Sequence, residues 1–303
     1  MTTSTSTTPL GDPTAASAEA APPRTVVVGV DGSETGLGAV RWAAREASRR
    51  GAPLRILHAA TYLGRASGSA PSPELPRARR ITAQAYTVAR HTDAGVKASA
   101  EVVTEEPITT LLGAAADGQL VVLGSSATGA PDELVLASVA VHVAARSPQP
   151  VVIVPRQRRG EPEDRPAVAV LGMGDREDDE AVAAFAAEAA GRFGVGLTVL
   201  QTRSPRRSVA DSWVDQPDEW HRRYPTLEVS RSDLPAPRGD QLLAATCPAP
   251  LLVVSAGNGS LLRRSLDGPH RWLLRHCTFP MALVPPVNRR GAPPQGEETI
   301  APS

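Results

Sequence analysis

Short apolar runs alternate with longer amphipathic segments along most of this chain. Residues 25–30 (TVVVGV) and 54–59 (LRILHA) are apolar runs of strand length, and between them apolar positions recur at helical spacing from about 34 to 50. Further runs stand at 120–124 (LVVLG) and 151–155 (VVIVP). Continuous apolar strands separated by longer helical segments predict a parallel sheet that is covered by helices on both faces.

The second half of the chain repeats this order of elements. An offset of 143 residues carries Gly29 onto Gly172, Trp42 onto Phe185 and Leu54 onto Leu197. The later strands repeat with offsets of 131, at 251–255 (LLVVS), and 130, at 281–285 (MALVP). The chain is therefore predicted to contain two copies of one unit.

The falling offset places a loss of about 12 residues in the second copy, between its second and third strands. The first copy has a long helical segment there, at about 76–92, and the second has a shorter and more polar one at 213–224. The nearby tryptophans are predicted to form an exposed aromatic patch that hints at a partner surface. These residues are Trp213, Trp220 and Trp272.

These patterns predict an α/β fold made of two doubly wound domains, each with a five-stranded parallel sheet. The expected domains are residues 24–155 and 166–286, joined by a charged linker at 156–165. The ends, 1–23 and 287–303, read as a disordered tail and a flexible tail. Because the last strand of each copy is an apolar edge, we expect the two domains to pair through these strands.

Composition excludes several classes of function. Lys+Arg and Asp+Glu balance at 32 each, so the net charge does not indicate a nucleic acid or an anionic membrane as partner. Lys97 is the sole lysine, and it opens an apolar run, which argues against a phosphate-loop lysine or a Schiff base. The two cysteines form no metal-binding motif. Without a signal peptide or a membrane-length apolar stretch, the chain is expected to be cytoplasmic.

Candidate binding residues lie where the first, second and fourth strands of the first copy end, since doubly wound sheets bind ligands there. Asp31 could reach a ligand hydroxyl, or it could serve as a helix cap and turn residue. His58 could line the site or simply cap its strand. The Gly/Ser loop after residue 124 could cradle phosphate, or it could be a plain connection. The candidate residues are Gly29, Val30, Asp31, Gly32, Ser33, His58, Gly124, Ser125, Gly129, Ser138 and Val139.

The segment 26–59, the Glu106-Pro107 step into a helix, and the strands LVVLGS at 120–125 and PVVIVP at 150–155 resemble the universal stress protein family. The resemblance covers most of 25–155 and, more faintly, 167–286. It implies flavodoxin-like domains, related to the adenine nucleotide alpha hydrolases, that pair as dimers or as tandem copies. One branch of the family binds ATP through a loop of the form Gly-x2-Gly-x9-Gly-Ser. For this chain, Mg is expected only together with ATP.

This sequence departs from the ATP-binding loop. Counted from Gly124, the second and third glycines of the pattern fall at Ala127 and Ala137, and Asp132 and Glu133 would repel a triphosphate. In the second copy, the 143-residue offset places Gly174, Asp175 and Arg176 at the positions of Asp31, Gly32 and Ser33. ATP is therefore considered for the first domain alone, and the second domain is expected to be structural.

Two functions remain open at this stage. The first is a non-enzymatic stress-response module that binds or senses adenine nucleotide, ATP included, in the first domain. The second is a nucleotide-free tandem pseudo-dimer that acts through a regulatory protein partner. A further homodimer of the tandem chain could accompany either function. A hydrolase or nucleotidyl transferase would need an HxGH, SGGxDS or GxSxG motif, and the sequence contains none.

Overall fold

A computed structural model describes residues 24–61, 74–125, 131–156, 165–171, 176–203, 213–235, 238–246, 249–256, 273 and 276–287. Ten strands form one sheet in the order β3-β2-β1-β4-β5-β10-β9-β6-β7-β8. The strands are β1 (Thr25–Gly29), β2 (Leu54–Ala59), β3 (Ala98–Val103), β4 (Gly118–Ser125), β5 (Val151–Pro155), β6 (Ala167–Leu171), β7 (Leu197–Arg203), β8 (Val229–Pro235), β9 (Leu252–Ser255) and β10 (Met281–Val284).

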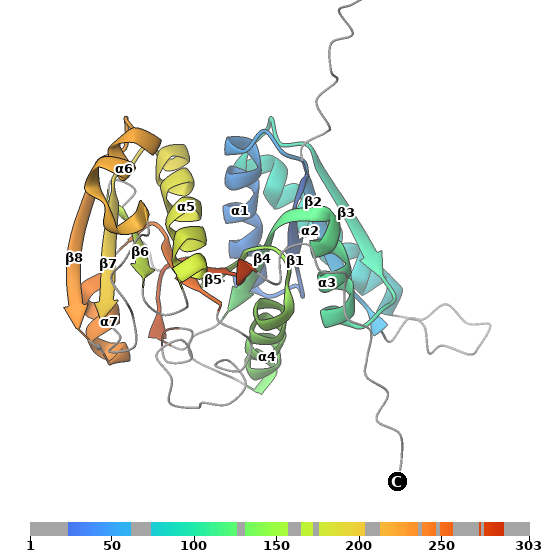
Figure 1. The fold of residues 1–303 in the computed structure, drawn as a ribbon. Coiled ribbons are helices and arrows are strands. Elements are labelled where there is room, and N and C mark those ends of the chain that lie inside the picture. Colours follow the sequence, from blue (N-terminus) through green and yellow to red (C-terminus); the bar gives the residue numbers. More distant parts are fainter. Residues whose placement is uncertain are drawn as a thin grey trace, which may run out of the picture.

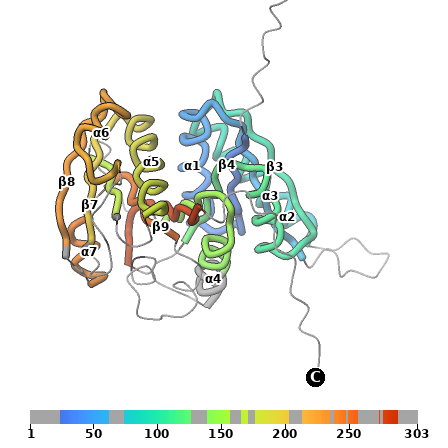
Figure 2. The backbone as a smooth tube through the Cα atoms, viewed as in Figure 1, coloured from blue at the N-terminus to red at the C-terminus, as the bar shows by residue number. Residues whose placement is uncertain are grey.

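The two halves of the sheet have the same topology. Each half is parallel, and the order 3-2-1-4-5 of the first half is repeated by 8-7-6-9-10 in the second. The halves join where β5 and β10 pair antiparallel, with Val152 opposite Ala282. Figure 2 shows the first half, blue to green, beside the second half, yellow to red. The predicted fold class, a tandem of doubly wound α/β units, is confirmed.

Helices cover both faces of this sheet (Figure 1). One face packs α1 (Glu34–Arg49), α2 (Glu74–Thr92) and α5 (Arg176–Phe193) against a core of buried aliphatic residues that extends across both halves. The other face packs α3 (Pro107–Asp117), α4 (Pro131–Arg146) and α7 (Gly239–Thr246) against a second core. Burial of strands on both faces explains why their sequences are continuously apolar rather than alternating.

The first strand of the second half is shifted from its predicted alignment. Ala167 pairs with Leu197 where the equivalent first-half pair is Val26 with Leu54, so β6 follows an offset of 141, although β7 follows 143. The alignment of Gly172 with Gly29 is therefore wrong by two residues. Both registers put alternate apolar residues on the same face, and for that reason the sequence pattern could not separate them. Of the predicted counterparts of the Asp31 turn, Gly174 and Asp175 lie outside the described residues, and Arg176 is the first residue of α5.

The trimmed region of the second half does not present the predicted aromatic patch. It folds as a short 3-10 turn, η2 (Trp213–Asp215), and α6 (Pro217–Arg223). Trp220 is 3% exposed, its indole Nε1 donates to the Val214 carbonyl over 2.8 Å, and its ring centroid lies 4.9 Å from that of Trp213. Both rings pack into or against the buried core on the α5 side of the sheet. Trp272 lies outside the described residues.

Helices α1 and α5 lie side by side in the centre of the molecule and meet through a buried ion cluster (Figure 1). Glu46 on α1 is 1% exposed, and its Oε1 accepts from Arg50 Nε at 2.6 Å and from Arg192 Nε of α5 at 3.2 Å. We call Glu46, Arg50 and Arg192 the interdomain triad. Burial lowers the pKa of the Arg50 guanidinium, and Glu46 opposes that shift.

Two cation–π contacts flank the interdomain triad. Arg49 lies over the Phe193 ring, 4.8 Å from its centroid, and Arg50 lies 5.7 Å from the Phe185 centroid. Because each contact joins α1 to α5, the triad and its aromatic neighbours connect the two halves on the face opposite α3 and α4. Within the described part of the chain, no helix combines the length and apolar character needed to cross a membrane.

Candidate functional site

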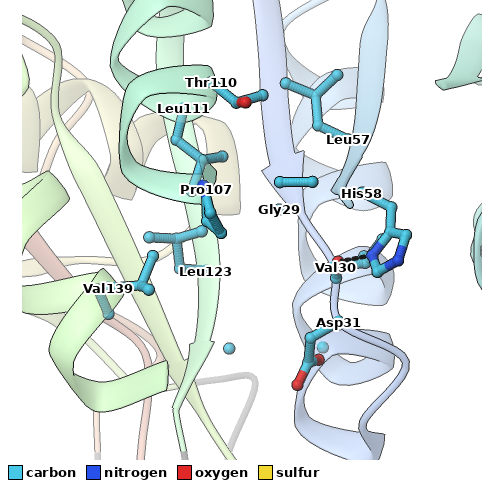
Figure 3. A pocket seen from close by; sticks show the side chains of 14 residues that line it. Gly29, Val30, Asp31, Leu57, His58, Pro107, Thr110, Leu111, Leu123 and Val139 are labelled. Carbon is cyan, nitrogen blue, oxygen red and sulfur yellow. Dashed lines mark hydrogen bonds between the residues drawn. The ribbon is translucent and has the colours of Figure 1, made fainter. Parts of the chain in front are cut away.

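A cavity of about 310 Å³ opens in the first half at the carboxyl ends of β1, β2 and β4 (Figure 3). After β1 the chain continues to β2 and β3 on one side and returns to β4 on the other, so the cavity lies where the strand order reverses. Helices α3 and α4 close its far side. The lining residues are Gly29, Val30, Asp31, Gly36, Leu57, His58, Ala59, Pro107, Thr110, Leu111, Leu123, Gly124, Val139 and Ala140.

Asp31 holds the turn between β1 and α1 with one of its carboxylate oxygens. Its Oδ1 accepts from the Ser33 backbone N–H at 3.0 Å and from the Ser33 hydroxyl at 2.7 Å. Among the described residues, its Oδ2 has no hydrogen-bond partner. The turn also needs Gly32, which has a φ of +88°. The turn role and a ligand role proposed for Asp31 are thus compatible, because they use different oxygens.

Ser33 is the N-cap of α1. Its hydroxyl accepts from the Gly36 N–H at 3.0 Å while it donates to Asp31, which places Ser33 beside the cavity without lining it. This geometry satisfies one of the free N–H groups at the start of the helix and fixes the direction of the Asp31 side chain.

Replacing Ser33 by alanine is expected to lower the free energy of unfolding by about 1 kcal/mol, the usual cost of losing an N-cap hydrogen bond. Urea denaturation followed by circular dichroism would measure this change. Thr104→Ala is a suitable control because Thr104 is exposed and its side chain makes no hydrogen bond to a described residue. Equal midpoints for the two variants would contradict the capping role.

Close packing surrounds two glycines of the cavity, but only at Gly124 are the nearest atoms backbone atoms that cannot move aside. A Cβ on Gly29 would lie 2.8 Å from Cδ2 of Leu123 and 3.0 Å from Cδ2 of Leu111. On Gly124 it would lie 2.6 Å from the carbonyl carbon and oxygen of Thr35, at the start of α1. The end of β4 therefore touches the backbone of α1, and Gly124 has a structural reason to be glycine that does not depend on a ligand.

His58 lies between the cavity and the ends of β1 and β2. It is buried, and its Nδ1 is 2.9 Å from the Val30 carbonyl oxygen, a hydrogen bond that the Nδ1-protonated ring donates (Figure 3). The contact ties the tips of β1 and β2 together, and His58 is one of the residues that line the cavity. His58 and Asp31 are the ionisable side chains among the described residues of the lining.

The remaining lining residues are largely apolar and were not among the predicted site residues. Helix α3 contributes Pro107, Thr110 and Leu111. Its N-cap Glu106 accepts from the Ile108 and Thr109 N–H groups at 3.0 and 3.2 Å. The Glu106-Pro107 step was a visible signal for this helix start. That this helix lines the cavity could not be predicted, because it depends on how α3 packs against the sheet. The wall residues absent from the predicted set include Leu57, Pro107, Thr110, Leu111, Leu123 and Ala140.

The cavity brings together six of the predicted site residues, namely Gly29, Val30, Asp31, His58, Gly124 and Val139. Gly32, Ser33 and Ser125 adjoin it without lining it, and Gly129 lies outside the described residues. Ser138 falls inside α4, which begins at Pro131. A backbone N–H so far into a helix is bonded within that helix, so it is not available to a phosphate group.

Comparison with known proteins gives a consistent result. The family model described as Universal stress protein family matches residues 23–155. A universal stress protein of Mycobacterium tuberculosis is 30% identical over 286 residues, covering 86% of this chain and 96% of that relative. The solved structure of a universal stress protein from Archaeoglobus fulgidus has a TM-score of 0.65 at 15% identity, covering 87% of this chain and 96% of its own. A solved universal stress protein in complex with cAMP is 27% identical, covers 45% of this chain and 100% of its own, and has a TM-score of 0.36.

Proposed function

Because this chain belongs to the universal stress protein family, we propose that it is a non-enzymatic stress-response module whose first domain binds an adenine nucleotide. The observation that supports this proposal best is the cavity at the switch point of the first half-sheet, with the Asp31 carboxylate at its edge. The second domain would have a structural role and pair with the first.

The cavity suits the base and sugar of a nucleotide. Its volume of about 310 Å³ falls at the lower end of the range for small-molecule sites, roughly 300–1,000 Å³. Apolar side chains such as Leu57, Leu111 and Leu123 would pack against a flat base, and water would be excluded from it. The Oδ2 of Asp31 could accept from a sugar hydroxyl, a charge-assisted hydrogen bond of the kind that orients ligands strongly.

The phosphate groups would have weaker support than the base and sugar. No lysine or arginine is among the described residues that line the cavity, and the Ser138 N–H lies within α4. We therefore expect binding of AMP to be comparable to, or tighter than, binding of ATP with Mg. When bound, the nucleotide would supply a signal rather than a reaction, because the described lining has no nucleophile with a general base beside it.

Asp31→Asn is expected to raise the Kd for AMP about tenfold or more, since a hydrogen bond to a charged group contributes roughly 1.5–3 kcal/mol. Isothermal titration calorimetry of the full chain with AMP and with ATP plus Mg would measure the change. Asp93→Asn is the matched control, because Asp93 holds a similar turn, with its Oδ1 2.8 Å from the Gly95 N–H, yet does not line the cavity.

Two results would count against this proposal. Absence of heat and of any thermal shift with AMP, ATP or adenosine would remove nucleotide binding altogether. Binding by wild type that Asp31→Asn leaves unchanged would move the site away from the β1 tip. Mass analysis of the freshly purified and then denatured protein would add an independent measurement, since a nucleotide bound in the cell should be released.

The second candidate is a nucleotide-free module that acts through a regulatory protein partner. It is favoured by the absence of cationic side chains from the described lining and by Ala127 and Ala137 in place of two loop glycines. If the nucleotide titrations fail, this reading gains support, and cross-linking of the full chain in stressed cells would be the next measurement.

A further inference from the structure

Thr110 is a buried polar residue whose hydroxyl is unpaired within the described part of the chain. It lies on α3, is 6% exposed, and lines the cavity. Its Oγ1 has no hydrogen-bond partner among the described residues. In Figure 3 Thr110 and Asp31 lie at opposite ends of the row of lining side chains, with Thr110 projecting from α3 toward Leu57.

Other helical threonines in this chain behave differently. On α2, Thr87 and Thr92 donate to the carbonyl oxygens four residues before them at 2.9 and 2.8 Å, and Thr82 donates to Arg79 O at 3.0 Å. Such bonds back to the helix are the ordinary way for a threonine hydroxyl to be satisfied. The Glu106 carbonyl, four residues before Thr110, accepts the Thr110 backbone N–H but receives no hydrogen bond from the Thr110 hydroxyl. The Thr110 hydroxyl is thus buried away from its usual acceptor.

An unpaired buried hydroxyl reduces stability, because it has lost its hydrogen bonds to water. Valine has nearly the same shape and would not carry this cost, so the presence of threonine calls for another cause. The surrounding side chains, Leu57, Leu111 and Leu123, are apolar and cannot hydrogen-bond to a ligand. Thr110 is therefore the one side chain at this end of the described lining that could orient a bound ligand by a hydrogen bond.

We propose that the Thr110 hydroxyl hydrogen-bonds the polar edge of a nitrogen heterocycle, such as a purine, inserted at the inner end of the cavity. This rests on the proposed function and makes Thr110 a specificity-determining residue of that site. The hydroxyl can donate or accept, so it selects for a ring with a polar edge over an apolar ring of similar shape. The aligned position in the second half is Gln241, which is exposed, so the second domain lacks this feature.

The test compares wild type, Thr110→Val and Thr110→Ser in the full chain, with AMP as the probe. Thr110→Val should raise the Kd for AMP about tenfold, while Thr110→Ser, which keeps the hydroxyl, should stay within about twofold. Without AMP, the midpoint of thermal unfolding of Thr110→Val should equal or exceed that of wild type, because the unpaired hydroxyl is gone. Calorimetric titration and differential scanning fluorimetry provide these two readouts.

The outcomes separate this role from the proposed function. If wild type binds AMP and Thr110→Val binds it equally tightly, the role of Thr110 is overturned and the site stands. If Thr110→Val unfolds at a lower temperature than wild type in the absence of AMP, the hydroxyl has a structural partner, and the inference is overturned for that reason. If wild type binds no AMP, the proposed function fails, and the role of Thr110 fails with it.

Discussion

Glu46→Ala should lower the free energy of unfolding by about 3–5 kcal/mol, the range observed when one partner of a buried ion pair is removed. Glu46 is 1% exposed and is the acceptor for both arginines of the interdomain triad. Without it, Arg50 and Arg192 would stay at the α1–α5 contact as two like charges with little water around them. Arg50 would keep its bond to Gln119 Oε1, at 3.1 Å, which replaces only part of the loss.

Equilibrium unfolding in urea, followed by circular dichroism, would measure this loss. Glu188→Ala is the matched control: Glu188 also pairs with Arg192, at 3.7 Å, but its side chain is 60% exposed, so its removal should change the free energy of unfolding by less than about 0.5 kcal/mol. If the two variants unfolded at the same urea concentration, the triad would not be a principal link between the halves.

Gly124→Ala is expected to destabilise the first half by about 3 kcal/mol, the upper part of the range for overpacking a core. The added methyl carbon would lie 2.6 Å from the Thr35 carbonyl and 2.8 Å from the Gly36 nitrogen. These are backbone atoms, so no side-chain rotation can relieve the clash. Helix α1 would have to move away from β4, and the Asp31 turn at its start would move with it.

Gly38→Ala provides the contrast within the same helix. A Cβ on Gly38 meets nothing within 4 Å, and alanine in a helix interior is favoured over glycine by roughly 0.5–1 kcal/mol. This variant should therefore be more stable than wild type when both are unfolded in urea. If Gly124→Ala were as stable as wild type, the close approach of β4 to α1 could not be as tight as described.

The sequence predicted the strands and helices of the first half closely, because their patterns are local. Strand β2 occupies 54–59 as predicted, and α1 ends at Arg49, where Gly51 with a φ of +61° turns the chain. The internal repeat predicted the order of strands and helices in the second half. It could not fix the register of β6, since a shift of two residues keeps every side chain on its own face and only hydrogen-bond pairing distinguishes the two registers.

The site was predictable on one side only. The tips of β1 and β4 carry short motifs, so Gly29, Asp31 and Gly124 could be selected from sequence. Thr110 and Leu111 belong to an ordinary amphipathic helix, and nothing local distinguishes them from core residues. Their place in the cavity depends on how α3 packs across the sheet. Trp220 was misassigned for a similar reason: burial of its ring depends on the shortened segment around it, which a composition pattern cannot describe.

Helices α1 and α5 pair through side chains that differ between the two halves. This difference limits the assemblies that either half could form with a copy of itself. Gly51 and Gly194 end the two helices in the same left-handed conformation, so position 46 corresponds to Ala189 and position 50 to Phe193. Two first halves in this geometry would bury a second net-positive triad in place of the Arg49–Phe193 stack. Two second halves would have no buried carboxylate for their arginines, because Ala189 stands at the position of Glu46 and Glu188 is exposed. The contact surfaces of the two halves have become complementary, so a return to identical self-assembling subunits would require coordinated changes on both helices.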